Sequence, residues 1–124
     1  MTLTTLFSAK IQSIGEEAHL FQEEKMIILF GKEAPVALAE YCYVIEFSPL
    51  TAEITKNQIL VIDDQQYPIT SVGDVVTKNL AQLGHITIKF DGASVASLPG
   101  TLHVVNQPIS ELVVGSKISI ESKQ

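Results

Sequence analysis

The segment GDVVTKNLAQLGHITIKFDG, residues 73–92, changes the period of its apolar residues halfway along. In its first half they recur at i, i+4 and i+7, which predicts a helix from Asp74 to Leu83. Asp74 has the side chain of a helix N-cap, and Gly84 suits the left-handed position after a helix C-terminus. The second half alternates apolar and polar residues, so we expect the helix to pass directly into a strand.

Short strands are predicted on both sides of this segment, because the chain repeatedly becomes alternating or β-branched. They fall at residues 5–11, 26–30, 42–47, 58–62, 67–70, 101–105 and 116–122. Residues 63–66, DDQQ, predict a hairpin with a longer loop than the tight two-residue type. Many short strands with only one convincing helix indicate a mainly β protein. We expect a small, mainly antiparallel β-barrel or barrel-like sandwich with one short helix.

Length and composition indicate one domain, residues 1–124, with 46% hydrophobic and 18% charged residues. A chain of this size buries a core without metal or disulfide staples. The N-terminal MTLTTLFSAK lacks the basic start and longer apolar run of a signal peptide, and no apolar run approaches the ~20 residues of a membrane span. We therefore expect a cytoplasmic protein.

The formal charge is −6, and every basic residue is a lysine. Nucleic-acid binders cluster lysine and arginine on one face, so the charge argues against a nucleic-acid partner. The single cysteine, Cys42, excludes an internal disulfide and a cysteine-built metal site, and its apolar surroundings predict a buried, inert thiol. Neither a GxSxG elbow nor a glycine-rich phosphate or dinucleotide loop is present, so no cofactor is predicted.

His85 starts the strand of the opening segment and falls on its polar face. Alternation places it on the same side as Thr87 and Lys89, whereas Ile86, Ile88 and Phe90 form the core side. One interpretation is a solvated strand face that carries an incidental histidine. The other is an imidazole presented to a partner, with a hydroxyl and an ammonium beside it to hold an anion.

The other two histidines offer weaker candidates. His103 shares a mixed face with Thr101 and Val105, which favours a packed histidine over a functional one. His19 lies in an acidic connector and is expected to be exposed and inert. Metal binding by His85 and His103 together is disfavoured, because no HxH or HExxH spacing and no neighbouring carboxylate supports it.

The segments APVALAEYC, YPITSVGDVVTKNLAQLGHITIKFDG and LPGTLHVV together resemble the glucitol/sorbitol-specific IIA component of the bacterial phosphoenolpyruvate-dependent sugar phosphotransferase system. The likeness spans nearly the whole chain, and residues 67–92 carry most of it. The resemblance implies a phosphocarrier that accepts a phosphoryl group on histidine from the histidine-phosphorylated phosphocarrier protein. It further implies transfer of that group to the IIB part of a IIB/IIC membrane permease, which phosphorylates sorbitol during import.

The chain departs from the family at one important position. The resemblance implies a phosphohistidine in the strand after Glu40-Tyr41-Cys42, and Ile45 occupies that place here. Either another histidine is the acceptor, with His85 first and His103 second, or the chain is a regulatory or ligand-binding relative without the chemistry. We favour His85, with Thr87, Lys89 and backbone N–H groups near Gly84 as the stabilising groups.

The relay function predicts the character of the partner surface. Exposed apolar or neutral residues should surround His85, and each contact should be small, at or below the ~1,200 Å² end of the size range, because it must be transient. A homodimer is also expected on edge-strand grounds, since short strands of a small sheet can pair between chains.

Overall fold

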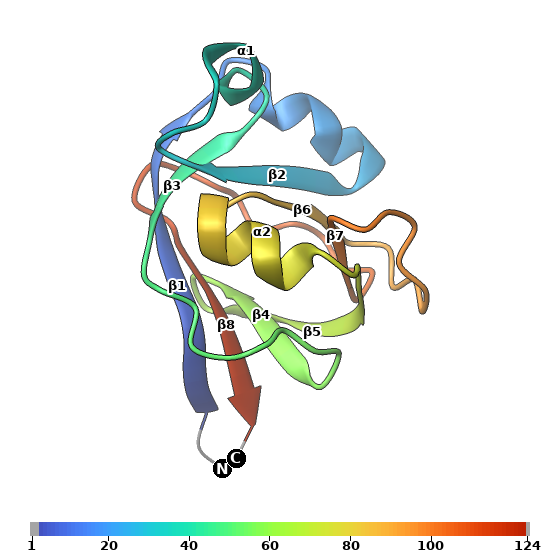
Figure 1. Cartoon of the computed structure of the whole chain (residues 1–124). Helices are drawn as coiled ribbons and strands as arrows, with labels where there is room; N and C mark the ends of the chain where they lie inside the picture. Colours follow the sequence, from blue (N-terminus) through green and yellow to red (C-terminus); the bar gives the residue numbers. More distant parts are fainter. Residues whose placement is uncertain (1–2, 124) are drawn as a thin grey trace.

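The structure, a computed structural model, describes residues 3–123. Within this range eight strands close into a barrel (Figure 1). Around the barrel they follow the order β1-β3-β2-β6-β7-β5-β4-β8. The strands are β1 (Leu3–Ile14), β2 (Met26–Gly31), β3 (Tyr43–Phe47), β4 (Gln58–Ile62), β5 (Gln65–Val72), β6 (Ile86–Lys89), β7 (Thr101–Val104) and β8 (Lys117–Lys123). The helices are the 3₁₀-helix η1 (Ala18–Glu24), α1 (Val36–Ala39) and α2 (Val76–Leu83).

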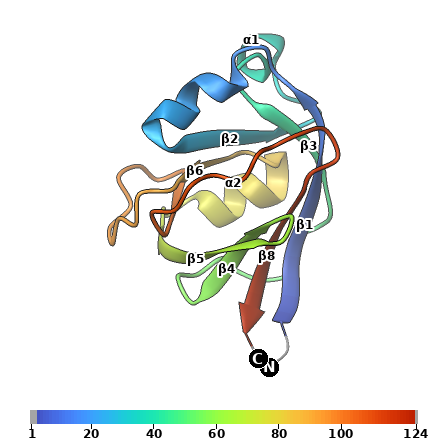
Figure 2. The same ribbon diagram turned by 180° about the vertical axis from the view of Figure 1, so that it is seen from behind.

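The expected β-barrel is confirmed, although the pairing is mixed. Strands β2 and β3 pair in parallel, as do β6 and β7, and the remaining neighbours are antiparallel. A parallel pair needs a crossover, and the segment with α1 supplies the one between β2 and β3 (Figures 1 and 2). Because the barrel is closed, the described strands leave no open sheet edge, so the edge-strand basis for a homodimer is removed.

The helix of the opening segment is present, but it begins later than predicted. Gly84 follows it with a φ of 67°, as expected for the left-handed position. Asp74 is not the N-cap: Val75 occupies that position, without a side-chain hydrogen bond. The N–H groups of Gly73 and Val75 donate to the carbonyls of Thr101 and Pro99, so the backbone before the helix is held against the segment that leads into β7.

The β4–β5 hairpin has a tighter turn than predicted. Ile62 pairs with Gln65, which leaves only Asp63 and Asp64 in the loop. Asp63 adopts a φ of 51°, a left-handed conformation that aspartate tolerates better than most residues. Its N–H donates to the carbonyl of Lys117, and its carboxylate accepts from the Lys117 N–H at 3.0 Å. Contact with β8, which the sequence could not reveal, holds the two-residue turn.

The core fills the barrel and is closed by one face of α2. Inward-facing side chains of the strands form a single apolar cluster, and Val76 and Leu80 of α2 belong to it. Tyr67 and Phe90 meet edge to face at 5.0 Å between ring centroids. The Tyr67 hydroxyl is 2.9 Å from the carbonyl of Pro108 and accepts from the Ser110 N–H at 3.0 Å, so the buried phenol has polar partners.

Gly84→Ala is expected to lower the free energy of unfolding by about 2 kcal/mol, because a Cβ is disfavoured at positive φ and meets a neighbouring ring. That Cβ would lie 2.5 Å from Cε1 of Phe47. Gly115→Ala is the matched control, since Gly115 also has a positive φ, 97°, but nothing lies within 4 Å of its Cβ position. Urea unfolding measures both variants. Equal losses would show that the contact with Phe47 costs nothing.

Candidate functional site

The alternation predicted for the strand after α2 is confirmed. Ile86 and Ile88 are buried on the core side of β6, while Thr87 and Lys89 are half-buried on the outer side. His85, directly before β6, is also half-buried. The turn at Gly84 therefore delivers the imidazole to the outer wall of the barrel, at the point where α2 ends.

The His85 ring is held by stacking. It lies against the Phe30 ring of β2, with 4.3 Å between centroids and an angle of 17° between planes. Partial burial lowers the pKa of His85 below its ordinary 6.5. Within residues 3–123 no hydrogen bond reaches either ring nitrogen, so the stack with Phe30 fixes the orientation that a polar partner commonly fixes. The lowered pKa favours the neutral form of the ring.

The groups predicted to stabilise a phosphoryl group are only partly available. The N–H of Gly84 donates to the carbonyl of Leu80 at 3.0 Å, and the N–H of His85 donates to Asn79 at 3.4 Å, so both are engaged at the helix end. Thr87 lies one pleat repeat, about 7 Å, from His85 on the same side, and Lys89 one repeat further. Thr87 is thus the nearer of the two residues along the backbone.

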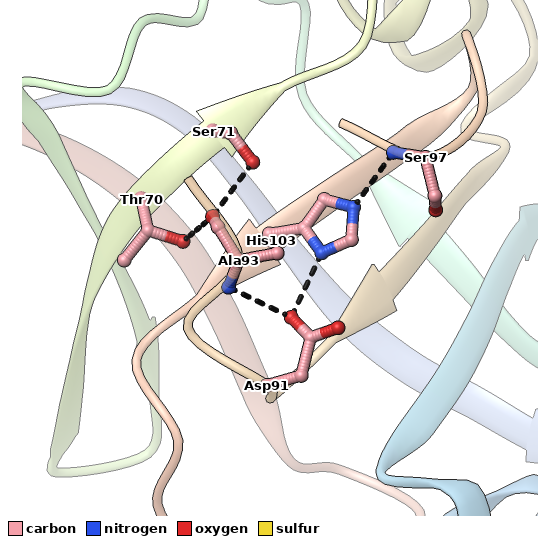
Figure 3. Close-up of polar contacts among 6 residues, drawn as sticks. All are labelled: Thr70, Ser71, Asp91, Ala93, Ser97 and His103. Atoms are coloured by element: carbon pink, nitrogen blue, oxygen red, sulfur yellow. Dashed lines mark hydrogen bonds and ion pairs between the residues drawn. The ribbon is translucent and has the colours of Figure 1, made fainter. Parts of the chain in front are cut away.

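His103 is enclosed, unlike His85. It lies in β7, is 1% exposed, and has a partner at each ring nitrogen (Figure 3). Nε2 accepts a hydrogen bond from the N–H of Ser97 at 3.3 Å, so Nε2 carries no proton. Nδ1 then bears the hydrogen and donates it to Oδ1 of Asp91 at 2.8 Å. This imidazole has no nitrogen free for a phosphoryl group.

The sequence predicted no carboxylate beside His103, and this prediction is wrong. Asp91, twelve residues earlier, reaches it because the loop after β6 turns back over β7 (Figure 3). Oδ1 of Asp91 also accepts the N–H of Ala93 at 3.1 Å. The carbonyl of Ala93 accepts from the hydroxyls of Thr70, at 2.7 Å, and Ser71, at 2.9 Å. His103 and Asp91 thus fasten the loop of residues 91–100 to β5 and β7.

The structure places His19 on the surface and separates His85 from His103 along the barrel. His19 is exposed on η1. The β6–β7 register pairs Lys89 with His103, so the backbone positions of His85 and His103 are two pleat repeats apart along neighbouring strands. No group of three histidine, cysteine, aspartate or glutamate side chains in residues 3–123 converges as metal ligands would.

Ile45, where the resemblance implies a histidine, is completely buried in β3. It pairs with Gly31 of β2, the residue after Phe30. Only β2 therefore separates β3, which carries Ile45, from β6, which His85 precedes. A pocket of about 260 Å³ opens here between residues 31–33, residues 45–47 and the end of α2 at Leu83. Cys42, three residues before Ile45, has a buried thiol, as predicted, and burial raises its pKa to about 11.

Stability is expected to fall in mild acid, because His85 has a lowered pKa in the folded state. A depressed folded pKa gives a stabilising contribution that is present above the unfolded pKa of 6.5 and is lost as the pH falls through the folded pKa. Urea unfolding of the wild-type protein and His85→Gln between pH 8 and pH 5 measures this contribution. The wild-type protein should lose more stability than the variant over that range, and equal slopes would contradict the assignment.

Asp91 extends the same trend to stronger acid. Partial burial raises its pKa, but the hydrogen bonds from His103 and Ala93 outweigh that effect, so the net pKa lies below 3.8. Its stabilising contribution is present above the unfolded pKa and is lost as the pH falls through the lowered folded value. The Asp91 side chain is 38% exposed, so solvent screening reduces its contribution to stability.

Together these features define a closed mixed β-barrel that presents one stacked histidine on its outer wall. Residues 6–119 match the family described as the PTS system glucitol/sorbitol-specific IIA component. The chain belongs to this family. It is 33% identical over 120 residues to the PTS system glucitol/sorbitol-specific EIIA components of Shigella flexneri and Escherichia coli K12, covering 97% of this chain and 98% of each relative.

A solved structure has the same fold. The crystal structure of a PTS system IIA component from Enterococcus faecalis V583 superposes with a TM-score of 0.77 at 25% identity, covering 90% of this chain and 96% of that one. No helix among residues 3–123 has the length and apolar character needed to cross a membrane.

Proposed function

We propose that this chain is a cytoplasmic phosphoryl relay for sorbitol (glucitol) uptake, with His85 as the phosphoacceptor. The donor is the histidine-phosphorylated phosphocarrier protein, and the recipient is the IIB part of the IIB/IIC permease. One observation carries the choice of histidine. His85 is held by Phe30 and is only partly buried, with no hydrogen bond from residues 3–123 to its ring, whereas both nitrogens of His103 are bonded in the interior.

The chemistry follows from the neutral state of the His85 ring. An unprotonated ring nitrogen uses its lone pair to form an N–P bond, while the N–P bond to the donor histidine breaks and that imidazole keeps the electron pair. The proton on the other nitrogen of His85 remains or passes to solvent. Such transfer depends on in-line positioning and on stabilising the charge of the phosphoryl oxygens. Thr87 and Lys89 are the side chains of the same face that can contribute.

Phosphoenolpyruvate, enzyme I and the phosphocarrier protein, incubated with this chain, test the proposal. We expect about one phosphate per chain, labile in acid and stable in base, as a phosphoramidate requires. Adding the IIB domain should then discharge it. A chain that remains unlabelled while a control IIA component is labelled in the same mixture would refute the relay.

Ile45 supports a second candidate function, a regulatory or ligand-binding relative that keeps the barrel and lacks the chemistry. Its side chain is entirely buried, so the family position implied for the phosphohistidine is part of the apolar core here. Ile45→His separates the two candidates. A wild-type chain without label and a variant that gains it would favour the second function, whereas labelling of the wild-type chain excludes it.

A further inference from the structure

Elements β1, η1 and α1 meet at one end of the molecule (Figures 1 and 2). These elements and the residues next to them carry large exposed apolar side chains. This set, called the α1 face, consists of Ile14, Leu20, Val36, Leu38 and Tyr41. Helix α1 has the sequence VALA and buries none of its residues. Val36 is 90% exposed and Leu38 49%. A helix made only of apolar residues that contributes nothing to the core is typical of a contact surface.

The α1 face belongs to one connected piece of backbone. The N–H of Gly15, after β1, donates to the carbonyl of Cys42 at 3.0 Å, and the N–H of Glu17 donates to Glu40 at 2.9 Å. The two segments that carry the exposed apolar side chains are thus hydrogen-bonded to each other. They form a fixed surface on which a partner can dock without first ordering a loop.

The surroundings of the α1 face are acidic. Residues 14–41 contain six glutamates and two lysines, so this quarter of the chain holds −4 of the total charge of −6. Glu16, Glu33 and Glu40 are exposed. A second copy of this chain would bring the same negative charge to the contact and be repelled. The surface instead fits a protein whose apolar centre is edged by lysine or arginine.

His85 is connected to this surface through β2 and the crossover that follows it. Its ring stacks on Phe30, and after Gly31 the chain enters the crossover that carries Val36 and Leu38. Strand β3, to which the crossover returns, pairs Val44 with Phe30. A protein seated on the α1 face and extending along β2 would meet the wall that presents His85, and a donor must do so because phosphorus has to come within ~3–3.5 Å of the ring nitrogen.

From these observations we propose that the α1 face is the docking surface for the phosphocarrier protein, through an apolar centre edged by basic side chains on that protein. The proposal rests on the proposed function for the identity of the donor. It adds the residues that bind the donor. It also assigns a binding role to α1, a helix that buries none of its residues in the core.

Calorimetric titration of the chain with unphosphorylated phosphocarrier protein tests the docking surface without any phosphoryl transfer. The variant Val36→Lys/Leu38→Lys removes the apolar contact and repels a basic edge, so we expect its Kd to rise by about tenfold or more. Val95→Lys is the control, because Val95 is 77% exposed in the loop of residues 91–100, away from α1. Its Kd should change less than about twofold. Raising the salt concentration should weaken wild-type binding.

Several results would overturn the proposal. One is a double variant that binds the phosphocarrier protein with wild-type affinity and keeps its melting temperature. The others are a wild-type chain that does not bind the phosphocarrier protein and a wild-type chain that binds only the IIB domain. A wild-type dimer that the double variant dissolves would make a second copy the occupant. Because no phosphoenolpyruvate is present, the choice of acceptor histidine does not affect the measurement. A chain that binds but takes no label would refute only the proposed function.

Discussion

His85→Gln is expected to reduce phosphate incorporation to the background of the assay. Glutamine approximates the length and polarity of histidine, but the lone pair of its amide nitrogen is delocalised into the carbonyl and does not attack phosphorus. The fold should persist, because the ring lies on the outer wall and is only half-buried. Incorporation from labelled phosphoenolpyruvate, with circular dichroism as the check on folding, measures the effect.

His103→Gln and His19→Gln are the matched controls for this experiment. Both should keep most of the label, because His103 is enclosed by Asp91 and Ser97, and His19 lies on η1 without a ring contact among the described residues. Loss of label in His103→Gln together with its retention in His85→Gln would make His103 the acceptor. His85 would then be a positioning group.

His103→Ala is expected to lower the free energy of unfolding by about 2–4 kcal/mol. The substitution leaves a cavity behind a fully buried ring and removes the hydrogen-bond partners of Asp91 and the Ser97 N–H. The loop of residues 91–100 should also become a site of rapid proteolysis, since its anchor to β7 is lost. Urea unfolding and limited proteolysis measure the two effects.

His19→Ala controls for the loss of an imidazole as such, and it should change stability by less than about 0.5 kcal/mol because its side chain is exposed. A His103→Ala variant as stable as His19→Ala would contradict the structural role of the buried ring. Asp91→Asn adds a finer test, because it keeps the shape of the side chain but removes the charge that accepts from Nδ1 of His103.

The features of the fold that depend on local pattern could be predicted from the sequence. The period change at Gly84 predicted both the end of α2 and the start of the next strand, because a left-handed glycine and an alternating pattern are local properties. The outer position of His85 followed from the same alternation. Barrel architecture was predictable as a class, since many short strands must bury one face each.

Features that depend on long-range contacts could not be predicted. Asp91 meets His103 only because the loop between β6 and β7 folds back, and no spacing in the sequence marks that return. The turn at Asp63 is tight because β8 holds it, and the start of α2 is displaced because segment 99–101 binds the preceding backbone. In each case a partner distant in the sequence determines the local geometry.

The candidate site shows the same division. Alternation placed Thr87 and Lys89 beside His85, but the stack with Phe30 required the register of β2 against β6. The N–H groups near Gly84 were expected to be free for a phosphoryl group, and the carbonyls of Asn79 and Leu80 occupy them. Backbone N–H groups at the end of α2 are therefore less available to an anion at His85 than the sequence indicated.

The assignment of the acceptor is tested most directly by a long-range ¹H–¹⁵N correlation spectrum of the chain before and after phosphorylation by the phosphocarrier protein. Each of the three histidines gives its own imidazole signals, so the spectrum identifies the phosphorylated ring without a substitution. We expect large ¹⁵N shifts for one nitrogen of His85 and small changes for His19 and His103. Phosphorylation shifts on His103 or His19, or unchanged signals from all three rings, would contradict it.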